Sequence, residues 1–62
     1  MKIEVMFTRV QDKPMVIVDV AQIPRQGDAL SLNPDEGAYF VDCTIFYADP
    51  KRGYPVAQVR VK

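Results

Sequence analysis

Apolar and polar residues alternate with a period of two along most of this chain, a pattern typical of β-strands with one buried face. In residues 2–8 the side chains of Ile3, Val5 and Phe7 fall on one face, which we predict to be the core side of a first strand. No segment carries apolar residues at helical spacing over three turns. A single helical turn at 33–36, opened by a capping asparagine and a proline, is the one helical alternative.

A second strand is predicted at residues 15–20, after a turn at 11–14 whose proline suits the entry of a strand. Its β-branched residues disfavour a helix. The segment is apolar on both faces apart from Asp19. One face carries Val16, Val18 and Val20, and the other carries Met15 and Ile17. The segment is therefore either a central strand or a strand whose second face meets another subunit.

Turns rich in glycine, proline and aspartate separate three further strands, at 29–32, 38–47 and 54–61. Continuous alternation divides the longest of them into two faces, Tyr39, Val41, Cys43 and Ile45 on one and Phe40, Asp42, Thr44 and Phe46 on the other. Five strands separated by four turns predict an all-β fold that forms a single small domain over residues 1–62.

The charged and reactive residues limit the kinds of ligand and of catalysis that the chain can support. Eight Lys and Arg balance eight Asp and Glu, so the basic excess typical of nucleic-acid-binding proteins is absent. The chain has no histidine, so Cys43 would lack its usual base as a nucleophile, and a zinc site would lack its usual donors. Cys43 is in phase with an apolar face, so we expect a buried, inert thiol. We expect no catalytic residue, no metal site and no cofactor.

Four carboxylates have two possible interpretations each. Asp35 and Glu36 are neighbours in a turn, where a local hydrogen-bonding role is expected and weak binding of a hard cation is the alternative. Asp19 and Asp42 interrupt apolar strands. We expect both to point outward and to discourage pairing between sheet edges, with a polar contact at an interface as the alternative.

Length and hydropathy set the expected environment. A chain of 62 residues buries only roughly 60% of its unfolded surface, so an oligomer is a common way to add buried area. No stretch approaches the ~20 apolar residues that span a bilayer, and no apolar block of a signal peptide follows Met1. Together with the single cysteine, this predicts a soluble protein of the reducing cytoplasm.

One segment supports a resemblance to a known class of fold. The residues that carry it are Ile23-Pro24-Arg25-Gln26-Gly27-Asp28-Ala29-Leu30-Ser31-Leu32, followed by Tyr39-Phe40-Val41 and a long aromatic strand. Over residues 23–62 this pattern resembles small SH3-like β-barrel proteins of phages and their bacterial hosts. The resemblance implies a five-stranded, partly open SH3-like barrel, and it implies no activity because that architecture hosts many functions.

Two groups of residues are candidates for binding. The first lies around one predicted turn and comprises Tyr47, Lys51, Arg52 and Tyr54, with Arg25 in another loop. Aromatic and basic side chains at a loop tip suit a protein hot spot or base stacking with phosphate contact, whereas a solvated hairpin tip is the simpler interpretation. The second group is apolar and comprises Met15, Ile17, Phe40 and Phe46. These four predict an oligomer interface, with a symmetric dimer favoured, unless the barrel curls and turns some of them inward.

These observations favour a non-catalytic protein-interaction module, a small homo-oligomer that docks on or inhibits a larger host protein. The resemblance makes a phage-encoded inhibitor or a virion component two specific versions of that hypothesis. The alternative is a small nucleic-acid-binding β-barrel, whose site would be the Tyr47–Tyr54 hairpin.

Overall fold

The computed structural model describes residues 1–9 and 12–62, and over these residues all five predicted strands form and no helix does. The strands are β1 (Lys2–Phe7), β2 (Val16–Asp19), β3 (Ala29–Asn33), β4 (Gly37–Phe46) and β5 (Ala57–Val61). The all-β prediction is confirmed, and residues 34–36 form a turn rather than a helix. The start of the turn predicted at 11–14 lies outside the described residues. Consistent with the absence of helices there, the described chain contains no helix able to cross a membrane.

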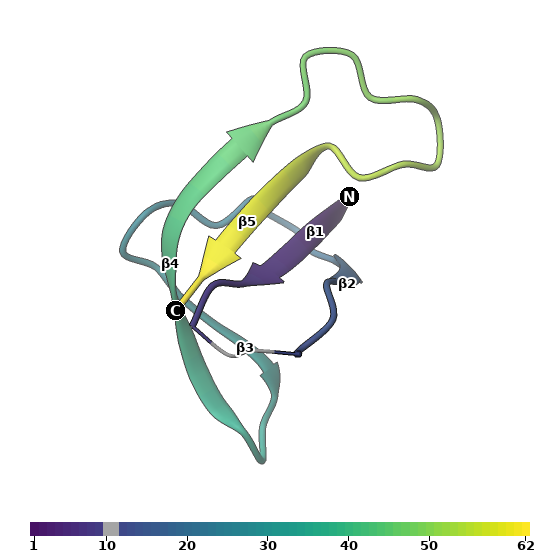
Figure 1. Cartoon of the computed structure of the whole chain (residues 1–62). Helices are drawn as coiled ribbons and strands as arrows, with labels where there is room; N and C mark the ends of the chain where they lie inside the picture. The colour runs from purple at the N-terminus through teal and green to yellow at the C-terminus, as the bar shows by residue number, and fades with distance from the viewer. Residues whose placement is uncertain (10–11) are drawn as a thin grey trace.

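The five strands form one strongly curled sheet in the order β2-β1-β5-β4-β3, a half-barrel that is open between its edge strands β2 and β3 (Figure 1). Neighbouring strands are antiparallel except for β1 and β5, which run parallel in the middle of the sheet. This arrangement agrees with the predicted partly open barrel. Because β2 lies at one edge, the interpretation of residues 15–20 as a central strand is wrong.

The core lies on the concave side of the sheet, called the inner face below. Among the described residues, the buried hydrophobic side chains of the core come from β1, β4 and β5: Ile3, Val5, Phe7, Val41, Ala57, Val59 and Val61. The parallel pairing sets Ile3 beside Ala57 and Val5 beside Val59, so each inward position on one central strand packs against the next. The core face predicted for β1 is therefore confirmed. Half-buried apolar residues of β2 and β3 extend this core toward the edges.

A β-bulge interrupts the alternation of β4. Val41 lies opposite Val61, but Cys43 lies opposite Arg60, so Asp42 is an extra residue between them. An extra residue exchanges the two faces of the strand beyond it. Thr44 consequently lies opposite the buried Val59, on the inner face, and the predicted continuous alternation is wrong beyond residue 41.

Three further side chains beyond the bulge are placed differently from the prediction. Cys43 and Ile45 are exposed on the convex side of the sheet, called the outer face below, so the expected buried thiol is wrong. Phe46 lies opposite the buried Ala57 and belongs to the inner side, where it remains largely exposed at the end of the strand. Phe40, which precedes the bulge, stays on the outer face, so the two phenylalanines point to opposite sides.

The loop between β2 and β3 is tied to the inner side of β4. The Thr44 hydroxyl donates to the carbonyl oxygen of Pro24 at 2.7 Å, and the Gly27 N–H donates to the carbonyl oxygen of Val41 at 2.9 Å. The Asp28 carboxylate closes the turn by accepting from the Arg25 N–H at 2.9 Å. These bonds hold the loop against β4 on both sides of the bulge.

Lys13 covers the end of the core formed by Phe7 and Tyr39. The two rings meet edge to face at 5.0 Å, and the Lys13 ammonium lies 4.6 Å from the centre of the Phe7 ring. It donates to the Tyr39 hydroxyl at 2.6 Å and pairs with Glu36 at 3.5 Å. The hydrogen bond to Tyr39 is the main cause that raises the pKa of Lys13. Glu36 thus has a basic partner, Lys13.

Candidate functional site

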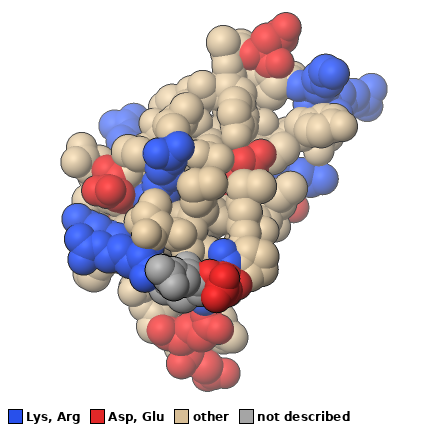
Figure 2. Space-filling view, viewed as in Figure 1, with Lys and Arg blue, Asp and Glu red and all other residues tan. Residues whose placement is uncertain are grey.

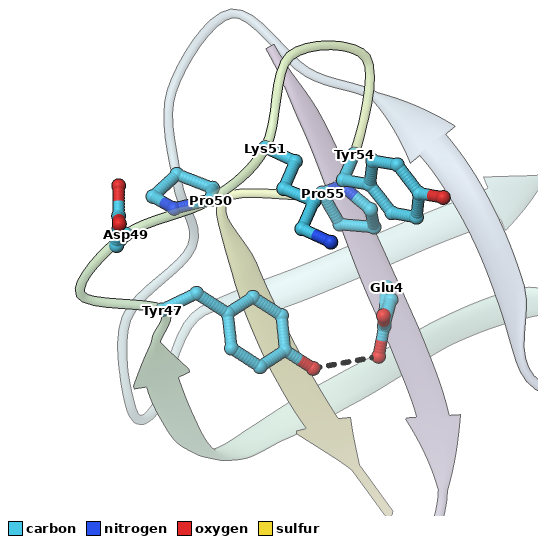
Figure 3. A pocket seen from close by; sticks show the side chains of 7 residues that line it. All are labelled: Glu4, Tyr47, Asp49, Pro50, Lys51, Tyr54 and Pro55. Atoms are coloured by element: carbon cyan, nitrogen blue, oxygen red, sulfur yellow. Dashed lines mark hydrogen bonds between the residues drawn. The ribbon is translucent and has the colours of Figure 1, made fainter.

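A pocket of about 330 Å³ lies where the loop between β4 and β5 folds back over the outer face of β1. Its lining combines two tyrosines, two prolines and three charged residues, Glu4, Tyr47, Asp49, Pro50, Lys51, Tyr54 and Pro55 (Figure 3). Glu4 lies between the buried Ile3 and Val5 and therefore projects from the opposite, outer face of the strand. The other lining residues come from the loop, so the pocket joins segments at opposite ends of the sequence.

Backbone hydrogen bonds fix the shape of this loop. The Tyr47 N–H donates to the carbonyl oxygen of Val56 at 2.9 Å and closes its base, and the Val56 N–H donates to Lys2 at 2.9 Å. At its tip, the Tyr54 N–H donates to the Lys51 carbonyl oxygen at 2.9 Å. Gly53 completes this turn at a φ of 84°, a left-handed conformation that glycine adopts without steric cost. The two tyrosines are therefore held at the base and the tip of one closed loop.

A row of hydrogen bonds forms the floor of the pocket and continues across the sheet. The Tyr47 hydroxyl donates to Glu4 Oε2 at 2.9 Å, and the Gln58 amide donates to the same oxygen at 3.3 Å. Arg60 Nε then donates to the Gln58 side-chain oxygen at 3.1 Å. The bond to Glu4 is the first cause of the raised pKa of Tyr47, so this hydroxyl remains a protonated donor at neutral pH. The row orients the Tyr47 ring as one wall of the pocket.

Lys51 and Tyr54 are the side chains most available to a ligand. Figure 3 shows Lys51 reaching from the loop into the space between the Tyr47 and Tyr54 rings, while Asp49 points away from them. The Tyr54 side chain is 65% exposed. Within the part of the chain that the structure describes, the Lys51 ammonium forms no ion pair. A ligand in this pocket would meet two aromatic rings and the Lys51 ammonium above the Glu4 carboxylate.

The structure brings together three of the five residues that the sequence suggested for partner binding. Tyr47, Lys51 and Tyr54 line the pocket, whereas Arg52 is exposed on the same loop but outside the lining. Arg25 lies elsewhere, in a second hollow of about 580 Å³ that also contains Phe46.

The sequence did not identify Glu4 or the two prolines as part of the site. The position of Glu4 on the outer face could be predicted from alternation, because both of its neighbours are apolar. Its proximity to Tyr47 could not, because it depends on pairing β1 with β5, more than fifty residues away in the chain. Pro50 was interpreted only as a turn residue, and Pro55 only as part of the last predicted strand at 54–61, which in the structure begins at Ala57.

The four residues predicted for an oligomer interface do not form one patch. Met15 and Ile17 lie at the β2 edge, 48% and 57% exposed. Phe40 is 55% exposed on the outer face of β4, separated from them by β1 and β5. Phe46 lies on the inner side, beyond the bulge. Met15 and Ile17 can therefore belong to one interface, whereas Phe40 and Phe46 each lie on a different part of the surface.

Charge is mixed over the surface that carries the pocket. On the face in Figure 2, basic and acidic side chains are interspersed around uncharged surface, including at the end where the loop between β4 and β5 lies. The pocket itself is lined by two carboxylates, Glu4 and Asp49, and one ammonium, Lys51.

Comparisons with models of protein families, with curated proteins and with solved structures found no match to this chain.

Proposed function

We propose that this chain is a non-catalytic protein-interaction module that docks on a larger protein through the pocket of Tyr47, Tyr54 and Glu4. The observation that carries the proposal is the exposed Tyr54 ring beside a Tyr47 ring already oriented by its bond to Glu4. Tyrosines on a fixed scaffold contribute a large contact area at a low cost in conformational entropy, and they are enriched in binding hot spots. The prolines of the loop reduce that cost further.

The charge of the pocket favours a protein partner over nucleic acid. Glu4 faces the pocket opposite the single ammonium of Lys51, the second lining carboxylate, Asp49, points away from the rings, and Arg52 lies outside the lining. Phosphate groups would be repelled by Glu4, whereas a protein surface can offer a donor to that carboxylate. The zero formal net charge of the chain supports the same choice, because long-range attraction to a polyanion would be weak.

Nucleic-acid binding is the second candidate, and the position of Lys51 is the observation that favours it. An ammonium between two tyrosine rings suits a base stacked on one ring with its phosphate on the lysine. This candidate predicts binding that weakens steeply with salt, because displaced counterions provide its driving force.

The finer version of the proposal is a homodimeric protein of the cytoplasm that inhibits a host enzyme by occupying a site on it. The single thiol supports the reducing compartment, and the small size together with the resemblance to SH3-like barrels of phages supports the inhibitor. The dimer adds the buried area that a chain of this length lacks.

Affinity capture with matched variants tests the proposal. The tagged chain, Tyr54→Ala and Phe40→Ala are each incubated with a bacterial lysate with and without nuclease, and the captured protein is purified and its affinity measured. Phe40 is the control, because it is also an exposed aromatic residue of the outer face but lies away from the pocket. We expect one host protein that survives nuclease and binds Tyr54→Ala more weakly by roughly 30-fold, as for an interface hot spot.

Two outcomes would contradict this proposal. Equal affinities for Tyr54→Ala and Phe40→Ala would remove the pocket as the docking site. Recovery of nucleic acid that is released at high salt, with no stoichiometric protein, would support the second candidate instead.

A further inference from the structure

The two edges of the half-barrel differ in chemistry. Within the described residues, β2 and β3 each pair with one strand only. The outer face of β3 carries Ala29, Ser31 and Asn33, and the Ser31 hydroxyl is engaged by carbonyl oxygens of its own hairpin. The outer face of β2 instead carries the exposed Ile17 and the exposed Asp19, with Met15 directly before the strand. Small and polar side chains cover the β3 edge, whereas the β2 edge combines large apolar side chains, Met15 and Ile17, with the carboxylate of Asp19.

Within the described part of the chain, the backbone of β2 also presents hydrogen-bonding groups that have no partner. Val20 exchanges two hydrogen bonds with Met1, at 2.8 and 2.9 Å, so its backbone groups face β1. Successive residues of an antiparallel strand direct these groups to alternate sides. Val16 and Val18 therefore also face β1, and Ile17 and Asp19 direct their N–H and C=O groups away from the sheet. The bond from the Val56 N–H to Lys2 agrees with the same alternation in β1.

The inner side of this edge is incompletely covered. Val16 and Val18 point toward the core, yet both are only half-buried, because among the described residues no strand lies beyond β2 at this edge. A strand added at this edge would cover their inner side and the Ile17 side chain together, and it would satisfy the free backbone groups.

We infer that the β2 edge pairs with β2 of a second copy of this chain, antiparallel across a two-fold axis. This inference rests on the homodimer of the proposed function. Antiparallel pairing centred on Ile17 sets the two isoleucines opposite each other on the outer face and sets Val16 opposite Val18 of the second copy on the inner face. Each Asp19 then lies opposite Met15 of the second copy rather than opposite the other Asp19, so no like charges meet. The zero net charge of the chain leaves no long-range repulsion between copies.

The size of this contact sets the expected strength of the dimer. A standard protein interface buries about 800 Å² on each partner, about a sixth of the 4651 Å² surface of this chain. A strand of four residues with its flanks covers less than that. We therefore expect a reversible dimer whose population depends on concentration in the micromolar range.

Sedimentation equilibrium from about 10 μM to about 1 mM, a range that brackets this affinity, tests the inference. Ile17→Lys places a charge at the two-fold axis, and we expect it to raise the dimer Kd at least tenfold. Ser31→Lys is the matched control at the other edge, and we expect it to dimerise like the wild type. Both positions are exposed, so circular dichroism is expected to show the β-sheet retained in each variant.

Amide hydrogen exchange gives a second test that needs no variant. The amides of Ile17 and Asp19 are expected to exchange slowly at high concentration of the wild type and rapidly on dilution. A monomer throughout the range, a dimer that survives Ile17→Lys, or one that Ser31→Lys disrupts equally would each overturn the inference. Tyr54→Ala is expected to dimerise normally, so loss of partner binding and loss of the dimer are measured separately.

Discussion

The exposure of Cys43 tests the bulge of β4 more directly than any other property of the chain. With continuous alternation Cys43 would lie in the core, and a thiol reagent would reach it only when the domain unfolds. A domain of 62 residues is stable by about 3–9 kcal/mol, so a core thiol would react roughly 10²- to 10⁶-fold more slowly than in the unfolded chain. The structure instead exposes Cys43, opposite Arg60 on the outer face. We expect its native rate to lie within about tenfold of the unfolded rate, because the thiol is open to solvent.

The assay follows the release of a coloured thiolate from a disulfide reagent, in native buffer and in denaturant. Val41→Cys in a Cys43→Ser background is the matched control, because Val41 is only 2% exposed and precedes Cys43 on the same strand by two residues. We expect strong protection of the introduced thiol and none of the native one. Comparable protection at both positions would refute the bulge, since both would then lie on one face.

Four further predictions concern stability, each measured by urea unfolding followed by circular dichroism. Val59→Ala removes two buried carbons and is expected to lower the free energy of unfolding by about 2–3 kcal/mol, or the urea midpoint by roughly 2 M. Val16→Ala at the half-buried edge should cost about half as much. Equal losses would contradict the position of the core. Gly37→Ala is expected to cost about 1–2 kcal/mol because the residue has a φ of 79°, and a neutral result would contradict that conformation. Thr44→Val keeps the shape but loses the bond to Pro24, with an expected loss of about 1 kcal/mol, and an unchanged midpoint would show that this tether contributes nothing. The pKa of Lys13 is raised in the folded state, so the stability that its charge contributes is complete below the ordinary value of 10.5 and is lost as the pH rises through the higher folded value. The loss of stability in Lys13→Met should therefore become smaller above pH 10.5. A loss that stays constant with pH would indicate that Lys13 contributes through packing alone.

The parts of the fold that depend on local pattern could be predicted from the sequence. Alternation identified the core face of β1, because the pattern within that strand alone is enough to place Ile3 and Val5 on one face. The turn at Gly37 could be predicted because glycine tolerates the left-handed conformation that the hairpin adopts there. These features are decided by residues a few positions apart.

The bulge could not be predicted, because the sequence continues the alternation falsely. Cys43 and Ile45 extend the apolar series of Val41, and Thr44 reads as an outward polar residue. The structure reverses both assignments, since Thr44 faces inward and its hydroxyl is satisfied by the carbonyl oxygen of Pro24. That partner lies in a separate loop, twenty residues away, so no periodicity within β4 contains the information.

The order of the strands in the sheet could not be predicted from the sequence either, and this limited how many residues of the site could be predicted. The pattern of each strand gives no information on which strands are neighbours, and the parallel pairing of β1 with β5 joins the first strand to the last. Tyr47, Lys51 and Tyr54 were suggested because a single loop carries them. Glu4 was not, because only the paired strands bring it beneath that loop.

The bulge and the pocket are connected through the position of Tyr47. In an uninterrupted strand, Tyr47 would share a face with Tyr39 and Val41 and would point to the inner side. The extra residue exchanges the faces, so Phe46 lies opposite Ala57 on the inner side and Tyr47 follows on the outer side, where its hydroxyl reaches Glu4 at 2.9 Å. β-bulges commonly redirect side chains next to functional sites. The β-bulge, which the sequence pattern does not reveal, thus orients one wall of the candidate binding pocket. The inward-pointing Thr44 connects the bulge to the loop between β2 and β3 through its hydrogen bond to Pro24.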